Sequence, residues 1–91
     1  MTVHKEAIIR GKVQGVFFRG STREKAMILG VMGEVKNLPD GSVWLVAEGD
    51  ENAVNELIAW CYRGPLRAEV EDVIVTEGVV VGYRDFQVTR H

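Results

Sequence analysis

Arg19 and Asn37 are the residues of this sequence whose types and settings most favour chemistry. Arg19 ends a glycine-punctuated run, GKVQGVFFR, that follows an apolar segment. Its planar guanidinium can bind two phosphate oxygens at once. Asn37 stands just before a turn, where its amide oxygen can hold a water and its amide nitrogen can donate to a ligand. The two residues are therefore two separate candidates for a functional site.

The backbone of the glycine-punctuated loop from Gly11 to Gly20 supports the first candidate, Arg19. Glycine lets a chain turn sharply, and a run of amides leading into a helix start can cradle an anion. The helix dipole adds a partial positive charge at the same place. Val16, Phe17 and Phe18 are then expected to wall the site and to keep water sparse, which strengthens charged contacts.

Each part of this site also has an ordinary structural interpretation. Glycine-rich loops are common, and this one lacks the lysine of the nucleotide P-loop, so Arg19 can equally form a surface ion pair. An asparagine before a turn often stabilises the turn itself. The residues alone leave these alternatives open.

Size and composition exclude several classes of protein. The chain has 91 residues, so we expect one domain over residues 1–91. A formal charge of −2 argues against a non-specific nucleic-acid binder. We see neither a signal peptide nor an apolar run long enough for a membrane span, and we expect a cytoplasmic protein.

The cysteine and histidines suggest no further chemistry. Cys61 is the single cysteine, fits a reducing compartment and is expected to lie in the core. His4 and His91 lie near opposite termini and are expected to be solvated. Because these residues have no metal-binding spacing, we expect no metal and no cofactor.

The first half of the chain predicts a strand, a helix and a hairpin. Residues 3–10 favour a strand, and residues 21–29 a helix, with Ser21 and Glu24 as a capping box. A helix start nearer Phe18 is the alternative, and Gly30 can end the helix. Pro39-Asp40-Gly41 predicts a three-residue hairpin turn between strands 34–38 and 42–48.

The second half predicts another helix and two strands. Asp50 can cap a helix at about 51–62, whose apolar residues recur at i, i+3, i+4 and i+7. Residues 69–77 and 85–90 alternate as strands do. The order β-α-β-β-α-β, with a short extra C-terminal strand, predicts an α+β, ferredoxin-like sandwich, in which an antiparallel sheet carries both helices on one face.

The sequence resembles the acylphosphatases over essentially its whole length. The resemblance rests on GKVQGVFFR (11–19), on GEVKN (33–37) and on DGSV (40–43), and it continues through AEG (47–49) and GP (64–65). It implies hydrolysis of an acyl phosphate to a carboxylate and inorganic phosphate. Arg19 and the loop amides of Gly15, Val16, Phe17, Phe18 and Arg19 would hold the phosphoryl group.

The resemblance also implies that Asn37 positions the attacking water, with no metal and no covalent intermediate. One departure concerns Glu34 and Trp44, where the family commonly has an aromatic and an acidic residue respectively. The predicted hairpin makes these two residues diagonal neighbours on one face, so we interpret the departure as a reciprocal swap. Lys36 is then expected to lie over Trp44 as a cation–π partner.

Two other functions compete with this interpretation. One is a non-catalytic module of the same fold that binds phosphate or carbamoyl phosphate. The other is a ferredoxin-like RNA-binding domain, which would carry its aromatic residues on the sheet rather than in a loop. The expected partners are a small acyl phosphate and inorganic phosphate, with no nucleic acid and no membrane, and the expected state is a monomer.

Overall fold

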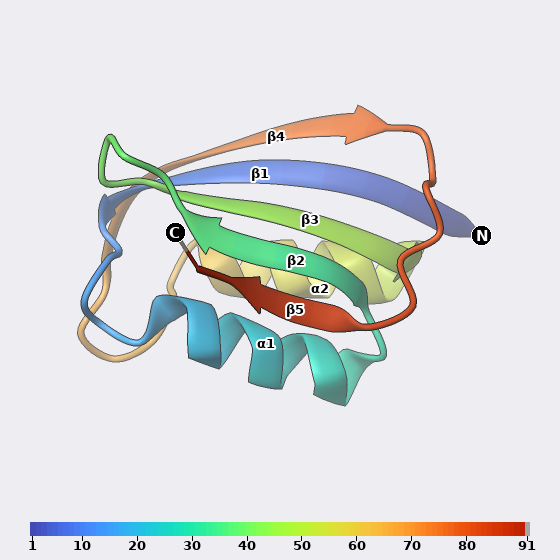
Figure 1. Ribbon diagram of the computed structural model, residues 1–91, viewed down its shortest axis with the longest axis horizontal. Coiled ribbons are helices and arrows are strands. Elements are labelled where there is room, and N and C mark those ends of the chain that lie inside the picture. Colours follow the sequence, from blue (N-terminus) through green and yellow to red (C-terminus); the bar gives the residue numbers. More distant parts are fainter. Residues whose placement is uncertain (91) are drawn as a thin grey trace.

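The computed structural model describes residues 1–90 and contains seven regular elements in the expected order. They are β1 (Thr2–Lys12), α1 (Phe18–Leu29), β2 (Met32–Asn37), β3 (Val43–Asp50), α2 (Glu51–Cys61), β4 (Glu69–Gly78) and β5 (Phe86–Thr89). Figure 1 shows both helices against the same face of the sheet. The predicted β-α-β-β-α-β order with an extra C-terminal strand is confirmed.

The strands form one sheet in the order β4-β1-β3-β2-β5. β1 pairs antiparallel with β3 and β4, and β2 pairs antiparallel with β3. β5 instead joins the edge of β2 in parallel, so the complete sheet is mixed. The parallel pairing sets the end of β5 beside the end of β2, because Lys36 pairs with Thr89.

The core lies between the sheet and the two helices. Ile9, Val35 and Leu45 face it from the sheet, and Leu57 and Cys61 face it from α2. Alternate strand residues therefore point to the helices, as the period of a half-buried strand requires. Cys61 is buried as expected, and burial raises the pKa of its thiol to about 12.

The helix expected at residues 21–29 begins earlier, so the capping-box prediction was wrong and the alternative start at Phe18 is confirmed. Phe17 occupies the N-cap position and offers no side-chain cap. Ser21 lies inside the helix, where its amide already donates to the Phe17 carbonyl at 3.1 Å. Gly30 ends the helix in the left-handed conformation, as expected.

The hairpin register is as predicted. Leu38 N–H donates to the Ser42 carbonyl at 2.8 Å, and Lys36 pairs with Trp44. Glu34 and Trp44 therefore share the face that points away from the helices. The Lys36 ammonium lies 4.8 Å from the centre of the Trp44 ring, which confirms the expected cation–π contact.

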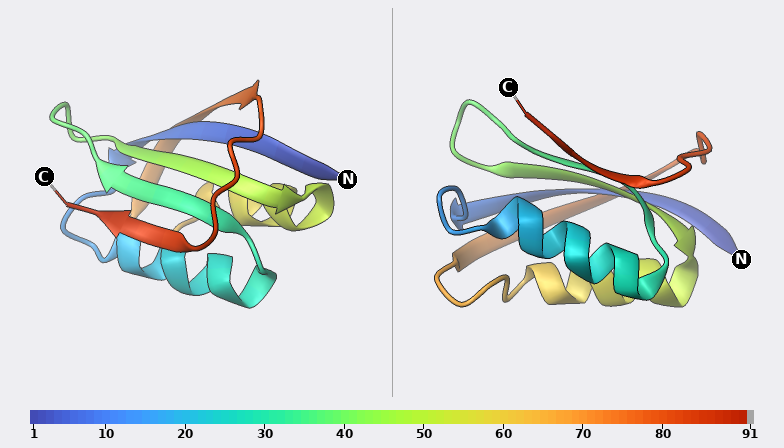
Figure 2. Two further views of the ribbon diagram at one scale, coloured as in Figure 1. Left: turned by 45° about the vertical axis from the view of Figure 1, so that its right-hand side comes forward. Right: turned by 60° about the horizontal axis from the view of Figure 1, so that its bottom comes forward.

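A segment without regular structure, residues 79–85, crosses the helix-free face of the sheet from β4 to β5 (Figure 2). Glu48 lies beneath it and accepts hydrogen bonds from the amides of Val81, Gly82 and Tyr83. His4 Nδ1 donates to the same carboxylate at 2.6 Å, and His4 is buried. The expectation of a solvated His4 was wrong, because its ring lies against Gly78 and hydrogen-bonds to Glu6 and Glu48. His91 lies outside the described residues.

Residues 1–90 contain neither a candidate membrane-spanning helix nor a candidate metal-binding cluster. None of the helices there is both long and apolar enough to cross a membrane. That same part of the chain holds no cluster of three or more His, Cys, Asp or Glu side chains placed to bind a metal ion.

Candidate active site

Arg19 and Asn37 line one pocket of about 320 Å³ at the end of the molecule where α1 begins and β2 and β5 end. The full lining is Val13, Gly15, Phe17, Phe18, Arg19, Gly20, Asn37, Val88 and Arg90. Arg19 and Asn37 are 18 positions apart in the sequence, and the packing of α1 on the sheet brings them together. The lining holds arginines and no acidic residue, so the pocket is cationic although the chain carries a net charge of −2.

The loop backbone enters the helix through two left-handed residues. Gly15 has φ 75°, which glycine adopts without steric cost. Phe17 has φ 62° and directly precedes α1. Because no side chain caps this helix start, amides of its first turn are free of that competition and can bind an anion.

Arg19 is held at the pocket by its position in the first turn of α1. Its Nη1 donates to the Thr89 carbonyl at 3.4 Å, which ties the guanidinium to the end of β5. The guanidinium carries five N–H donors, so this single long contact leaves donors for a ligand. No ion pair engages Arg19 within residues 1–90, so the surface ion pair considered above is not formed there.

Asn37 is the last residue of β2, and its Oδ1 is buried with no hydrogen-bond partner among residues 1–90. Turn stabilisation would require that oxygen to accept from a nearby backbone amide. Asp40 does this instead, since its carboxylate accepts from the Ser42 amide at 2.9 Å. A rotation of the Asn37 amide about its last torsion, which is broad, would turn Oδ1 toward the pocket without breaking a hydrogen bond to it.

Gln14 connects the loop to the strand end that carries Asn37. Its amide nitrogen donates to the carbonyls of Leu38 and Ser42, at 2.8 and 2.9 Å. These bonds span the hairpin at its turn and fix the loop relative to β2. The sequence pointed to no role for Gln14, because a single polar residue in a loop carries no distinguishing pattern.

The structure separates the predicted wall residues. Phe17 lines the pocket, and Phe18 lines it while its ring packs on Trp60 with centroids 5.7 Å apart. Val16 is absent from the lining and belongs to the core, with 8% of its surface exposed. The prediction that its side chain walls the site was therefore wrong, whereas the proposed role of its backbone amide is independent of that side chain.

Arg90 and Val88 line the pocket and were missed. They reach it because β5 pairs in parallel with β2, and nothing in the alternation of residues 85–90 specifies that partner. A basic residue directly after a terminal strand was the one available signal.

Comparison with known proteins decides the family. The acylphosphatase family model matches residues 5–88. The chain belongs to the acylphosphatase family. A relative from Rubrobacter xylanophilus named acylphosphatase is 56% identical over 81 residues, which cover 88% of this chain and 74% of the relative.

Two further acylphosphatases show the same similarity. A relative from Methylococcus capsulatus is 50% identical and covers 91% of each chain. The solved structure of an acylphosphatase from Coxiella burnetii has a TM-score of 0.94 at 44% identity, and the match covers 97% of this chain and 93% of that one. Sequence and fold thus both place this chain among the acylphosphatases.

Proposed function

We propose that Arg19 and Asn37 carry out the acyl phosphate hydrolysis that membership of the acylphosphatase family indicates. The observation that carries this proposal is the unpartnered, buried Oδ1 of Asn37 on the same pocket as Arg19. Buried polar atoms without partners are rare and call for an explanation. A water held for reaction supplies one, whereas a purely structural asparagine would use its oxygen in the fold.

Arg19 and the loop amides bind the phosphoryl group. The guanidinium neutralises charge on two of its oxygens, and amides from Gly15 to Arg19 donate to the others. The α1 dipole adds to the positive potential at this point. These groups are already in place before substrate binds, so charge that develops during reaction is stabilised without reorganisation.

Asn37 positions the water that attacks phosphorus. Its oxygen accepts a hydrogen bond from the water and so aims a water lone pair at the phosphorus atom, opposite the departing carboxylate. The new bond joins the water oxygen to phosphorus, the bond from phosphorus to the acyl oxygen breaks, and its electron pair leaves with the carboxylate. A phosphate oxygen takes the water proton, so the products are a carboxylate and inorganic phosphate.

This division of labour suits the substrate. A carboxylate is a good leaving group, and phosphoryl transfer depends mainly on positioning and on charge stabilisation. The departure of the carboxylate therefore requires no strong general acid. The non-catalytic module of the same fold is not favoured, because relatives at 50–56% identity over most of the chain are named acylphosphatases.

We also propose that residues 1–91 act as one domain, as a monomer and in the cytoplasm. The lone, buried Cys61 supports a reducing compartment, since it has no partner for a disulfide. Sedimentation at micromolar concentration would check the monomer, and a mass of twice the chain's would contradict it.

The proposal is tested by phosphate release from benzoyl phosphate. Arg19→Ala and Asn37→Ala are each expected to lower kcat/KM at least about 100-fold, the scale of losing one preorganised donor. Ile28→Ala is the matched control, because Ile28 is exposed on α1 and lines neither the pocket nor its surroundings. Turnover close to that of the wild type in both variants would contradict the mechanism.

A further inference from the structure

A groove of about 840 Å³ opens directly off the phosphate pocket and runs along α1 beside β5. The two spaces share Phe17, Gly20, Val88 and Arg90. The groove continues past Met27 to the far end of the helix, at Gly30 and Val31. Asn37 lines the pocket but not the groove.

The groove has an apolar floor and a charged rim. Val31 and Phe86 are buried at its base, and Met32 and Val88 are half-buried beside them. Its charged side chains are all exposed; they are Arg23, Glu24, Arg84, Asp85 and Arg90. Such a lining accepts an apolar group and leaves the charges in water.

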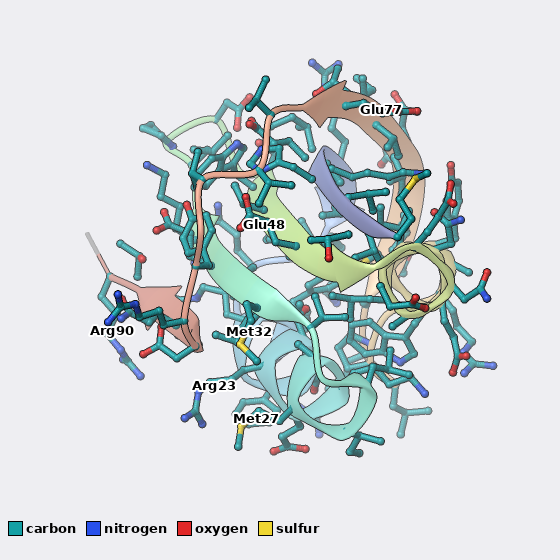
Figure 3. The ribbon with its side chains drawn as sticks, turned by 90° about the vertical axis from the view of Figure 1, so that its right-hand side faces the viewer. Arg23, Met27, Met32, Glu48, Glu77 and Arg90 are labelled. Atoms are coloured by element: carbon teal, nitrogen blue, oxygen red, sulfur yellow. The ribbon has the colours of Figure 1, made fainter. Side chains whose placement is uncertain are left out.

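Two apolar side chains are exposed along the groove. Met27 has 59% of its surface exposed and Phe17 has 66%. Figure 3 shows Met27 and Arg23 extending from α1, with Met32 and Arg90 on the same side of the molecule. Arg23 Nε donates to the Phe86 carbonyl at 3.2 Å and so joins the two walls, which fixes their separation.

Phe17 connects the pocket to the groove. It is the one residue other than glycine with positive φ among residues 1–90. A bulky side chain in that conformation is a genuine outlier. Its ring lies over Gly20, since a Cβ there would fall 2.4 Å from the ring. A strained, exposed aromatic ring at the junction of two binding spaces points to contact with a ligand.

We propose that this groove binds the acyl group of the substrate and that the enzyme prefers aromatic or branched apolar acyl phosphates. The inference rests on the proposed hydrolysis. In-line displacement sets the leaving carboxylate opposite the attacking water, and therefore on the side of the phosphate away from Asn37. The groove leaves the pocket past Phe17 and Val88, away from Asn37's strand end, so an acyl group there meets Phe17, Val88 and Met27.

The test compares benzoyl phosphate with acetyl phosphate, whose acyl group is too short to reach Met27. Met27→Glu is expected to lower kcat/KM for benzoyl phosphate roughly tenfold, the scale set by lost apolar pocket contacts. Its kcat/KM for acetyl phosphate should change less than about twofold. Glutamate suits an exposed helix position, so the variant is expected to fold.

Ile28→Glu is the matched control, because Ile28 is 79% exposed on the same helix and does not line the groove. It should leave both rates unchanged. Phe17→Gly supplies a second variant that relieves the positive φ, and it is expected to lower the ratio of the benzoyl to the acetyl kcat/KM.

The outcomes separate this inference from the function on which it rests. Hydrolysis of acetyl phosphate by the wild type, with equal effects of Met27→Glu on both substrates or none on either, would overturn the groove assignment alone. Failure of the wild type to hydrolyse either acyl phosphate would overturn both proposals.

Discussion

Two buried polar groups on neighbouring strands, the Glu48 carboxylate and the Asn37 Oδ1 atom, differ in their hydrogen bonding. Glu48 of β3 accepts hydrogen bonds from His4 and from the amides of Val81, Gly82 and Tyr83. Asn37 of β2 has an oxygen with no partner among residues 1–90. A satisfied buried carboxylate stabilises the fold, whereas an unsatisfied amide oxygen is a local cost, which the water-positioning role that we propose for Asn37 would explain.

The surroundings of Glu48 lower the pKa of its carboxyl group. Burial opposes the charged form, but the hydrogen bonds from His4 and the backbone amides outweigh it and lower the pKa of Glu48 from 4.5 to about 2. Burial likewise disfavours charge on His4, yet its hydrogen bonds to Glu6 and Glu48 raise the His4 pKa above 6.5. The crossing segment is therefore fastened to the sheet by hydrogen bonds from its amides to an ionised carboxylate.

The largest effect on stability is expected from Glu48→Ala. Removing the carboxylate leaves His4 and three backbone amides without their partner, and breaking a buried ion pair typically lowers the free energy of unfolding by about 3–5 kcal/mol. Urea unfolding measures it. Glu77→Ala is the control, because Glu77 is exposed on the edge strand β4 and its loss should matter less than about 0.5 kcal/mol. Equal effects of the two substitutions would contradict the structural role of Glu48.

A change of pH is expected to alter the free energy of unfolding less than Glu48→Ala does. The contribution of Glu48 is complete above pH 4.5 and is lost as the pH falls through about 2. The contribution of His4 is complete below pH 6.5 and is lost as the pH rises through its raised pKa. Stability from this pair should therefore be greatest between pH 4.5 and 6.5.

The His4→Asn substitution separates the loss of stability at alkaline pH, which comes from His4, from the loss at acid pH, which comes from Glu48. The wild-type free energy of unfolding should fall on the alkaline side, while that of the variant should be flatter there. Groups facing His4 include Glu6 and Glu48, and Tyr83 lies beside the same carboxylates. An alkaline fall of identical slope in both proteins would show that His4 does not titrate in this way.

The smallest effect on stability is expected from Asn37→Ala. Because the Asn37 oxygen makes no hydrogen bond within residues 1–90, its removal forfeits none and should change the free energy of unfolding by less than about 1 kcal/mol. The same urea titration measures it. A loss as large as that for Glu48→Ala would mean that Asn37 supports the fold and would end the contrast between the two strands.

The sequence predicted correctly those turns and helix caps that are formed by residues close together in the chain. The Pro39-Asp40-Gly41 turn fixed the hairpin register, and the Asp50 carboxylate caps α2 by accepting from the Asn52 amide at 3.2 Å. The start of α1 was misjudged because Ser21 and Glu24 mimic a cap. The true start depends on the left-handed Phe17, a conformation that sequence preferences assign to glycine.

Contacts distant in sequence were beyond such signals. The pairing of Arg19 with Asn37 in one pocket was predicted through a family resemblance, not from spacing. Arg90 reaches the pocket only through the parallel pairing of β5 with β2. His4 becomes buried through contacts with Glu48 and Gly78, which are distant in the sequence, and neither event leaves a local pattern.

Binding of inorganic phosphate tests the division of labour between Arg19 and Asn37 most directly. Calorimetric titration of the product into each variant measures phosphate affinity without turnover. Arg19→Ala should weaken binding about tenfold or more, the scale of a charge-assisted hydrogen bond, while Asn37→Ala should leave the affinity within about twofold of the wild type. Equal weakening in both variants would contradict the assignment of phosphate to Arg19 and of water to Asn37.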